Sequence, residues 1–452
     1  MAETSRSCFG LFFYWIMYLP NKLWGKVIEM SKMAKKLGKD DPRRIVHAFK
    51  VGLALTLVSL FYYFNPLYEG LGFNAIWAVL TVVVVFEFSV GATLGKAINR
   101  MWATVLGGGL GLGCHRIATL SGRTGEPILL ATFVFIIAFV MTYTRFFPTM
   151  KRRYDYGLLI FILTFSLVSV SGYRDSQIIQ TAHMRVSTII IGSCSSVIVC
   201  ICICPVWIGQ DLHNLVLGNI EKLGVFLLGF GNEYFKESDE DGESDNDNKS
   251  FLENYKGVLT SKTTEENMAN FAKWEPGHGK FKFFHPWKQY LKIGNLSREC
   301  AYKIETLYNN LHSEFKSSKE IRSKFSEACK IVSMESGKAL EELGAATKKM
   351  QRSRKAREHI ENAKTIAENV KSALKINEWE GASLVDIVQV GTVCLVLLEI
   401  IQSIEKIEEA INELANMADF DTLSPQHPHV LHSAIVQPIP NCADTIVITV
   451  RE

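Results

Sequence analysis

Six charge-free apolar stretches lie within the first 210 residues of this 452-residue chain. In chain order they are residues 51–68, 71–86, 101–114, 128–144, 156–173 and 186–210. About 16 to 20 apolar residues in a helix match the roughly 30 Å hydrocarbon thickness of a bilayer, and a helix in lipid satisfies its own backbone groups. The sequence therefore predicts six transmembrane helices, of which the third is short. Such stretches argue against a soluble fold for this half.

The second half of the chain has a different character. Hydrophobic residues make up 48% of the whole chain, which is lean for a protein embedded in lipid along its full length, and charge returns densely after residue 210. Apolar residues recur there every three or four positions, at Ile400, Ile401, Ile404, Ile407, Ile411 and Leu414. This spacing predicts helices with one buried face. Val388–Leu398 is charge-free but too short to cross a membrane, which indicates a buried bundle helix.

Together these patterns predict an all-α membrane protein, with six transmembrane helices followed by a cytosolic helical domain. The predicted parts are a cytosolic N-terminal segment at 1–44, a transmembrane domain at 45–208, a cytosolic helical domain at 209–422 and a flexible tail at 423–452. The N-terminal segment contains an aromatic piece at 8–20, which is too short to span and lacks the features of a signal peptide, so it predicts an interfacial helix.

Residues 237–249 carry seven acidic side chains and no aromatic one. Such a segment cannot bury enough apolar surface to fold, and it is predicted to be a disordered loop. A calcium loop is the alternative, but the spacing lacks the required Gly and Glu. Ser238 and Ser244 lie among these acidic residues and are candidate kinase targets.

Basic residues set the expected orientation. The first fifty residues contain ten Lys and Arg, and further basic residues lie in the second and fourth links, whereas the first link has none. The positive-inside rule therefore predicts that both termini are cytosolic. The net charge of +3 gives no reason to expect a nucleic-acid partner, so the bilayer is the predicted environment.

No motif in the chain predicts an enzyme, a cofactor or a metal site. The eleven histidines form no metal-binding pair, and of the cysteines in the sixth span Cys200 and Cys204 share a helix face while Cys202 points elsewhere, so the three cannot hold one metal. Glycines 107 to 113 include two GxxxG spacings, which permit close helix contacts. A phosphate loop is excluded because no Gly-Lys-Ser/Thr follows them.

The link after the second apolar stretch is unusual because it contains Glu87, Lys96 and Arg100. If the chain bends back at Gly91 or Gly95, Glu87 forms an ion pair that holds the turn, which is favoured over a role as a proton relay. Lys96, Arg100 and Arg185 all fall at predicted span ends. They are either interfacial anchors or part of an anion pathway, because a basic side chain in lipid needs water or a partner.

Several long segments carry a family resemblance. They are WAVLTVVVVFEFSVGATLGKAINR at 77–100, DPRRIVHAFKVGLALTLVS at 41–59, YDYGLLIFILTF at 154–165, PVWIGQDLH at 205–213, WEPGHGKFKFFHPWKQY at 274–290 and CAYKIETL at 300–307. These segments closely resemble the plant aluminium-activated malate transporters, a family of anion channels. The matches occur in order over residues 41 to 310, and they make the resemblance specific.

The resemblance implies a homodimer whose subunits share a conduction path for malate and for chloride or nitrate. It implies that Arg100 and Arg185 line the pore, with Lys96 as a third candidate. Trp274, Glu275 and Pro276 match a cytosolic motif of the family, for which a structural or gating role is expected.

Two rival functions remain. A proton-coupled organic-acid exporter needs a titratable group at mid-membrane, whereas Glu87, His115 and His183 lie near span ends. A membrane-anchored scaffold would not need basic residues at the span ends. The short N-terminal extension favours the plasma membrane over the vacuolar membrane. Weak aluminium activation is expected because Glu69, Glu126 and Asp175 offer one carboxylate per outer link.

Overall fold

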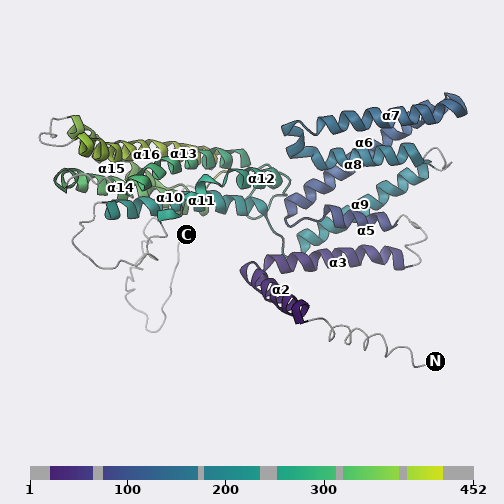
Figure 1. Cartoon of the computed structure of the whole chain (residues 1–452), viewed down its shortest axis with the longest axis horizontal. Helices are drawn as coiled ribbons and strands as arrows, with labels where there is room; N and C mark the ends of the chain where they lie inside the picture. The colour runs from purple at the N-terminus through teal and green to yellow at the C-terminus, as the bar shows by residue number, and fades with distance from the viewer. Residues whose placement is uncertain are drawn as a thin grey trace, which may run out of the picture.

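A computed structural model describes residues 21–64, 75–171, 178–234, 252–311, 319–375 and 384–420. The described residues form helices joined by short loops, and the pairing of His278 with Phe281 is a single isolated bridge. The predicted interfacial helix at 8–20, the acidic loop at 237–249 and the tail at 423–452 lie outside these residues. Figure 1 shows two groups of helices that meet end to end.

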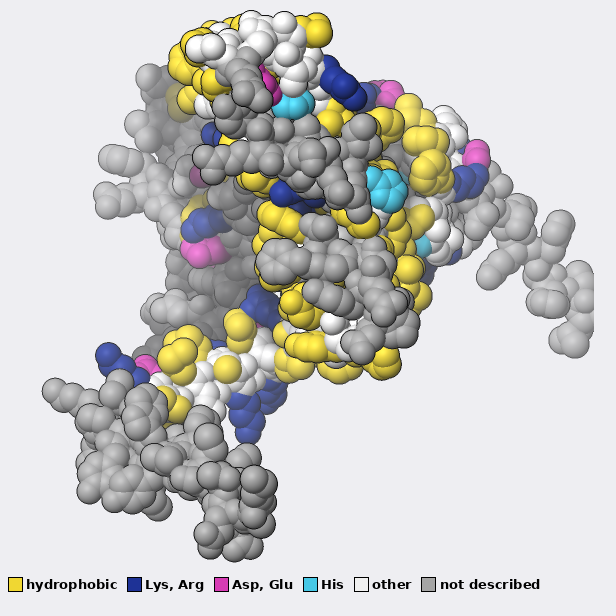
Figure 2. All heavy atoms as spheres, turned by 90° about the vertical axis from the view of Figure 1, so that its right-hand side faces the viewer, with side chains coloured by type: hydrophobic (Ala, Val, Ile, Leu, Met, Phe, Trp, Pro, Cys, Tyr) yellow, Lys and Arg dark blue, Asp and Glu magenta, His cyan; other side chains and the backbone are white. Residues whose placement is uncertain are grey.

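The first group, called the membrane half below, contains most of the apolar helices. Its members are α3 (Arg43–Tyr63), α5 (Ile76–Val85), α6 (Val90–Thr119), α7 (Gly122–Thr144), α8 (Pro148–Ser171) and α9 (Ile178–Cys202), and α2 (Asn21–Asp40) precedes them. Hydrophobic side chains make up much of its coloured surface at the end away from the second group (Figure 2). On α7, Ile128, Phe135 and Phe139 are exposed, as expected of side chains that face lipid.

Five helices of the described chain are long and apolar enough to cross a membrane, and four of them, α3, α7, α8 and α9, belong to the membrane half. The chain is therefore a multi-pass, all-α membrane protein, as the sequence predicted. Helix α5 has only 10 described residues, and α6 is long but less apolar. The total of six spans stays a prediction.

Helix α6 differs from the short third span at 101–114 that hydropathy indicated. It is a continuous helix of 30 residues, about 45 Å long, so Lys96 and Arg100 lie within a helix and not in a link. The chain reverses at residues 86–89, and the Ser89 hydroxyl accepts a hydrogen bond from the Ala92 amide at 3.3 Å. Ser89 is a favourable N-cap, so α6 begins here, before Gly91 and Gly95, where the sequence placed a bend.

Close packing against α8 explains part of the glycine run in α6. A Cβ added at Gly107 would lie 2.8 Å from the Phe161 carbonyl oxygen, and one at Gly111 would lie 3.1 Å from Val168. The Gly107–Gly111 spacing is therefore a helix contact, as the sequence suggested. Gly109 has open space around it.

This difference predicts opposite outcomes for two matched substitutions. Gly107→Ala is expected to lower the melting temperature of the detergent-solubilised protein, because its methyl group clashes with backbone. Gly109→Ala is expected to leave it unchanged or to raise it, since Ala in a helix is favoured over Gly by about 0.5–1 kcal/mol. Fluorescence-detected size exclusion after heating measures both variants. Equal effects of the two changes would contradict this packing.

The second group, called the bundle below, contains α10 (Ile208–Tyr234), α11 (Lys256–Leu259), α12 (Lys262–Ala272), α13 (Trp287–Leu311), α14 (Lys319–Lys348), α15 (Arg354–Lys375) and α16 (Leu384–Met417). The predicted apolar stripe of α16 is confirmed: Ile400, Ile404 and Ile407 are buried in the bundle core. Although α16 is the fifth helix with the length and composition of a span, residues of its 388–398 segment, such as Val393 and Leu397, are buried in the same core.

A buried ion pair positions α12 at the junction with the membrane half. The Arg298 guanidinium on α13 donates to the Glu265 carboxylate on α12 at 2.7 Å, and Ser261 and Asn219 also donate to Glu265. A buried charge pair is stable only when further hydrogen bonds satisfy it, which is the case here. The end of α12 is thereby held against α6.

Candidate functional site

Two of the predicted site residues converge on one tyrosine. Lys96 and Arg100 are four residues apart in α6, so they share a helix face, and this face meets Tyr156 on α8. The Arg100 guanidinium donates to the Tyr156 hydroxyl at 3.0 Å, and the Lys96 ammonium lies 5.5 Å from the centre of the Tyr156 ring. Arg100 is only 5% exposed, and its Nε has no hydrogen-bond partner among the described residues.

Glu87 forms the ion pair that the sequence predicted, with Lys96 as its partner. The Glu87 backbone amide also donates to the Thr93 hydroxyl at 3.0 Å, which fixes the carboxylate beside the start of α6. Lys96 is thus partly neutralised, whereas Arg100 has no carboxylate partner among the residues that the structure describes. Of the two basic residues on this face of α6, Arg100 is therefore the one that keeps its full positive charge.

Arg185 lies apart from these two residues. Its guanidinium is 4.4 Å from the centre of the Trp77 ring, so it packs between α9 and α5. Seventeen residues of α9, about 25 Å, separate it from Cys202, which precedes the bundle. The structure therefore places basic charge at two levels of the membrane half instead of gathering all three predicted residues.

The sequence did not identify Lys50 as a site residue. It is 1% exposed and donates to the Cys204 carbonyl at 2.9 Å, just beyond the end of α9. A cation at a helix C-terminus is favourable because the carbonyl groups there carry partial negative charge. In the sequence, Lys50 stood out only as a lysine directly before an apolar stretch. Tyr156 was likewise missed, since its role depends on a contact between distant helices.

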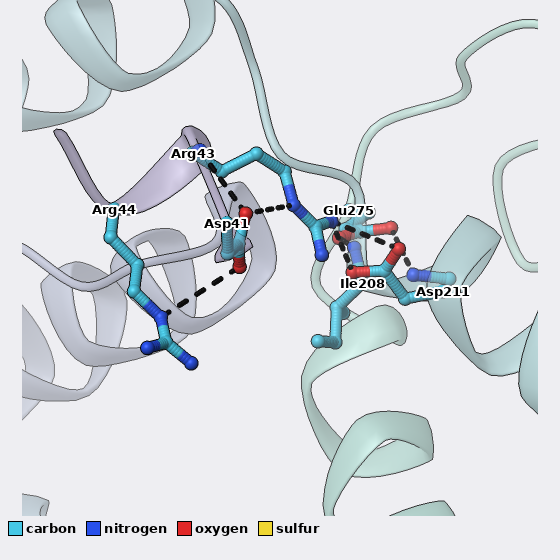
Figure 3. A network of polar contacts seen from close by, with 7 residues as sticks. Asp41, Arg43, Arg44, Ile208, Asp211 and Glu275 are labelled. Carbon is cyan, nitrogen blue, oxygen red and sulfur yellow. Dashed lines mark hydrogen bonds and ion pairs between the residues drawn. The ribbon is translucent and has the colours of Figure 1, made fainter. Parts of the chain in front are cut away.

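The Trp274–Glu275–Pro276 motif lies at the junction of the two halves. The Glu275 carboxylate accepts hydrogen bonds from the Ile208 amide at 2.6 Å and the Gly209 amide at 3.0 Å, at the first residues of α10 (Figure 3). The backbone amide of Gly91, at the start of α6, also favours this carboxylate. Glu275 therefore caps α10 and packs against the start of α6 at Gly91.

Burial and hydrogen bonding shift the pKa of the Glu275 carboxyl in opposite directions. Burial raises its pKa from 4.5 to about 7, and the backbone amides of Gly209, Ile208 and Gly91 limit this rise. Trp274 contacts α6 directly, since a Cβ added at Gly95 would lie 2.9 Å from its indole Cδ1. The Pro276 carbonyl accepts a hydrogen bond from the His278 ring at 3.0 Å. The motif therefore ties α6 to the bundle.

Two exposed ion pairs add to this junction. The Arg43 guanidinium, at the start of α3, donates to the Asp211 carboxylate on α10 at 3.1 Å and to the neighbouring Asp41 at 3.2 Å (Figure 3). On the other side, Arg152 of α8 pairs with Glu266 of α12 at 3.1 Å. Exposed pairs contribute at most about 1 kcal/mol each, so the buried Glu275 is the stronger connection.

A cluster of aromatic and histidine rings supports the motif from the bundle side. The Tyr290 hydroxyl lies 2.8 Å from His213 Nδ1 and 3.2 Å from His285 Nε2, and all three residues are buried. Burial lowers the pKa of each of these histidines to about 4, so both are neutral at physiological pH. Trp207 stacks on His278, with ring centres 3.9 Å apart. The cluster is a rigid support for the loop that carries Glu275.

Among the described residues, the site has the basic side chains that bind anions and no arrangement typical of catalysis. No group of three His, Cys, Asp or Glu side chains among them is arranged to hold a metal ion. Of the three expected outer carboxylates, Glu126 lies 3.9 Å from His115, and Glu69 and Asp175 lie outside the described residues. What the site offers is basic side chains at the edge of an apolar helix layer.

Known proteins match this chain along most of its length. The family model described as Aluminium activated malate transporter matches residues 35–380. Aluminum-activated malate transporter 2 of Arabidopsis thaliana is 50% identical over 397 residues, which cover 87% of this chain and 79% of the relative. Aluminum-activated malate transporter 7 of the same plant is 48% identical over 422 residues (87% and 83%), and Aluminum-activated malate transporter 1 of Triticum aestivum is 41% identical over 436 residues (93% and 91%).

Proposed function

Because this chain belongs to the aluminium-activated malate transporter family, we propose that it is a channel that passes malate, and the smaller anions chloride and nitrate, passively through a homodimeric pore. The family and the named relatives are transporters. This multi-pass membrane protein is accordingly a transport protein and not an enzyme.

The observation that carries the proposed pore is the buried guanidinium of Arg100. A buried guanidinium is costly unless its N–H groups meet water or hydrogen-bond partners. An interfacial anchor would extend toward the membrane surface, whereas Arg100 is buried against α8 and leaves its Nε unpaired among the described residues. A passing anion supplies the missing partner.

Arg185 supplies a second basic level in this mechanism. With one copy of each residue per subunit, a dimer has two Arg100 and two Arg185 side chains along the path. Each pair lowers the energy of an anion in the apolar layer, and conduction also requires release, which weak sites in series allow. Malate carries two negative charges, so each basic side chain stabilises it about twice as strongly as it stabilises chloride. A membrane potential of 100 mV is worth about 2.3 kcal/mol per charge and drives anions out of a negative-inside cell.

The proposed role of the Trp274–Glu275–Pro276 motif is gating. Glu275 contacts the starts of α6 and α10, so a movement of the bundle is transmitted to the helix that carries Lys96 and Arg100. Kinase control at Ser238 and Ser244 stays a prediction, since both residues lie outside the described ones.

Voltage clamp of oocytes that express the protein tests the proposed function. After injection of malate, we expect an inward current, which corresponds to anion efflux, to exceed that of water-injected cells several-fold. The current should persist when chloride replaces malate. Expression at the cell surface without any added anion current would reject the proposal.

The proposed orientation places both termini and the bundle in the cytosol, with the plasma membrane as the predicted location. A tag at either terminus should then resist protease in sealed right-side-out vesicles and be cleaved after detergent is added. The reason is the excess of Lys and Arg in the N-terminal segment and in the second and fourth links. Cleavage of a tag in intact vesicles would show the opposite orientation.

Strong activation by aluminium is not expected. A hard trivalent cation needs several converging carboxylates, and Glu126, the outer carboxylate that the structure describes, lies beside His115. The anion current should change less than about twofold when micromolar aluminium is added outside at acidic pH. A reversible several-fold increase would show that Glu69 and Asp175 meet in a way that the sequence did not indicate.

A further inference from the structure

A basic cavity of about 460 Å³ lies where the membrane half meets the bundle. The first turns of α6 and α8 line it on one side, and the end of α12 lines it on the other. Its basic lining residues are Lys96, Lys151, Arg152, Arg153 and Lys273, and Tyr154, Tyr156, Phe271 and Trp274 supply aromatic surface. Asp155 is the one acidic residue of the lining, and Arg145 neutralises it through two hydrogen bonds.

Among the residues that the structure describes, three of the five cations lack a counterion. Lys96 pairs with Glu87 and Arg152 pairs with Glu266, whereas Lys151, Arg153 and Lys273 have no ion pair with any described carboxylate. Burial lowers the pKa of Lys273, and the nearby Arg153 and Arg152 lower it further. Positive charge is therefore concentrated in this cavity without compensation from the described residues.

The surroundings of the cavity have the character of a membrane interface. Large aromatic side chains are exposed at the corner between α7 and α8, next to Lys151–Arg153; they are Tyr143, Phe146, Phe147 and Tyr154. Phe146 is 78% exposed. Aromatic side chains collect at the level of lipid headgroups, since their rings favour that boundary. The cavity is thus within reach of a headgroup.

We propose that this cavity binds the phosphorylated headgroup of a phosphoinositide lipid from the adjoining leaflet. Basic pockets at the cytoplasmic ends of transmembrane helices suit such headgroups, and Lys and Arg bind phosphate oxygens through strong charge-assisted hydrogen bonds. Lys151 and Arg153 approach from α8 and Lys273 from the bundle, so a ring with several phosphates joins the two halves. The inference rests on the proposed cytosolic position of the bundle.

The chemistry favours a clustered phosphate over a carboxylate ligand. The unpaired cations come from two elements on opposite sides of the cavity, and a dicarboxylate such as malate carries two negative charges, fewer than these three cations. A headgroup with two or more phosphates presents many acceptor oxygens around a ring. Its acyl chains would remain in the bilayer beside the exposed aromatic residues.

Binding to the purified full-length protein in detergent tests this assignment. The probes are a short-chain phosphatidylinositol 4,5-bisphosphate, free inositol 1,4,5-trisphosphate and short-chain phosphatidylcholine. The test variant combines Lys151→Gln, Arg153→Gln and Lys273→Gln, none of which belongs to the proposed anion path. The matched control removes three exposed cations from α15 by Arg354→Gln, Lys355→Gln and Lys371→Gln. Size exclusion and melting temperature establish that both variants are folded, and Arg153→Gln alone is measured as well.

We expect the bisphosphate lipid to bind the wild type, and its Kd to rise about tenfold or more in the test variant and less than about twofold in the control, since each basic side chain contributes several-fold in affinity. Equal binding to test variant and wild type, or none to the wild type, would overturn the proposal. If free inositol 1,4,5-trisphosphate binds the wild type as tightly as the bisphosphate lipid does, the ligand of the cavity is a soluble polyphosphate and not a lipid. Displacement of the lipid by low millimolar malate would instead assign the cavity to the anion path. Since these readouts need no current, they are independent of the proposed channel function.

Discussion

Replacing Arg100 by Ala is expected to reduce the malate current about tenfold or more at unchanged surface abundance. The substitution removes a buried cation at the bundle end of the membrane half, where Glu87 already neutralises the neighbouring Lys96. A loss of about 1.4 kcal/mol of stabilisation for the anion corresponds to a tenfold change in rate, and a divalent anion loses more than chloride does. Voltage clamp with malate and then chloride as the permeant anion measures both effects.

Two further variants separate charge from position. Arg116→Ala removes an exposed cation from the last turn of the same helix and should leave the malate current nearly unchanged. Arg100→Lys keeps the charge but not the planar guanidinium that contacts Tyr156, so an intermediate current is expected. If Arg100→Ala conducts malate like the wild type, Arg100 is only an anchor.

Glu275→Ala is expected to weaken the junction between the two halves by about 1–3 kcal/mol, because it leaves the half-buried amide of Ile208 and the buried amide of Gly209 without an acceptor. We expect a lower melting temperature and altered voltage dependence of the current. Glu275→Gln retains an acceptor oxygen and should have a smaller effect. The control is Glu266→Gln, which removes an exposed partner of Arg152 at the same junction.

The pH dependence of stability gives a sharper test of Glu275. Its pKa in the folded protein, about 7, lies above the ordinary value of 4.5, so folding favours the protonated form. This contribution to stability is fully present below pH 4.5 and is lost as pH rises through about 7. Between pH 5.5 and 8 the wild type should lose a few °C of melting temperature that Glu275→Gln does not lose. Parallel curves for the two proteins would contradict the raised pKa.

Some elements of this fold could be read from local pattern alone. The long apolar runs of α3, α7, α8 and α9 are visible because lipid requires them, and the isoleucines of α16 follow the helical repeat. Helix α6 could not be delimited in this way. Hydropathy falls where Lys96 and Arg100 occur, although the helix continues, since both side chains find partners in Glu87 and Tyr156.

The site depended on information that sequence spacing does not contain. Glu275 lies 66 and 67 positions from the amides it caps, and Lys50 lies 154 positions from the carbonyl it contacts. Family resemblance identified Arg100, Arg185 and the Trp274–Glu275–Pro276 motif without their contacts. The predicted topology already placed Arg185 in the outer fifth link, away from Arg100 in the second link, and the fold adds that Arg185 packs on Trp77 of α5.

Reconstitution of the purified protein in a planar bilayer tests passive malate conduction most directly. With unequal malate concentrations and equal pH on the two sides, the current should reverse near the malate equilibrium potential, and a pH gradient added afterwards should leave the reversal potential unchanged. A reversal potential that follows the pH gradient, or malate flux without current, would contradict the channel and indicate proton-coupled export.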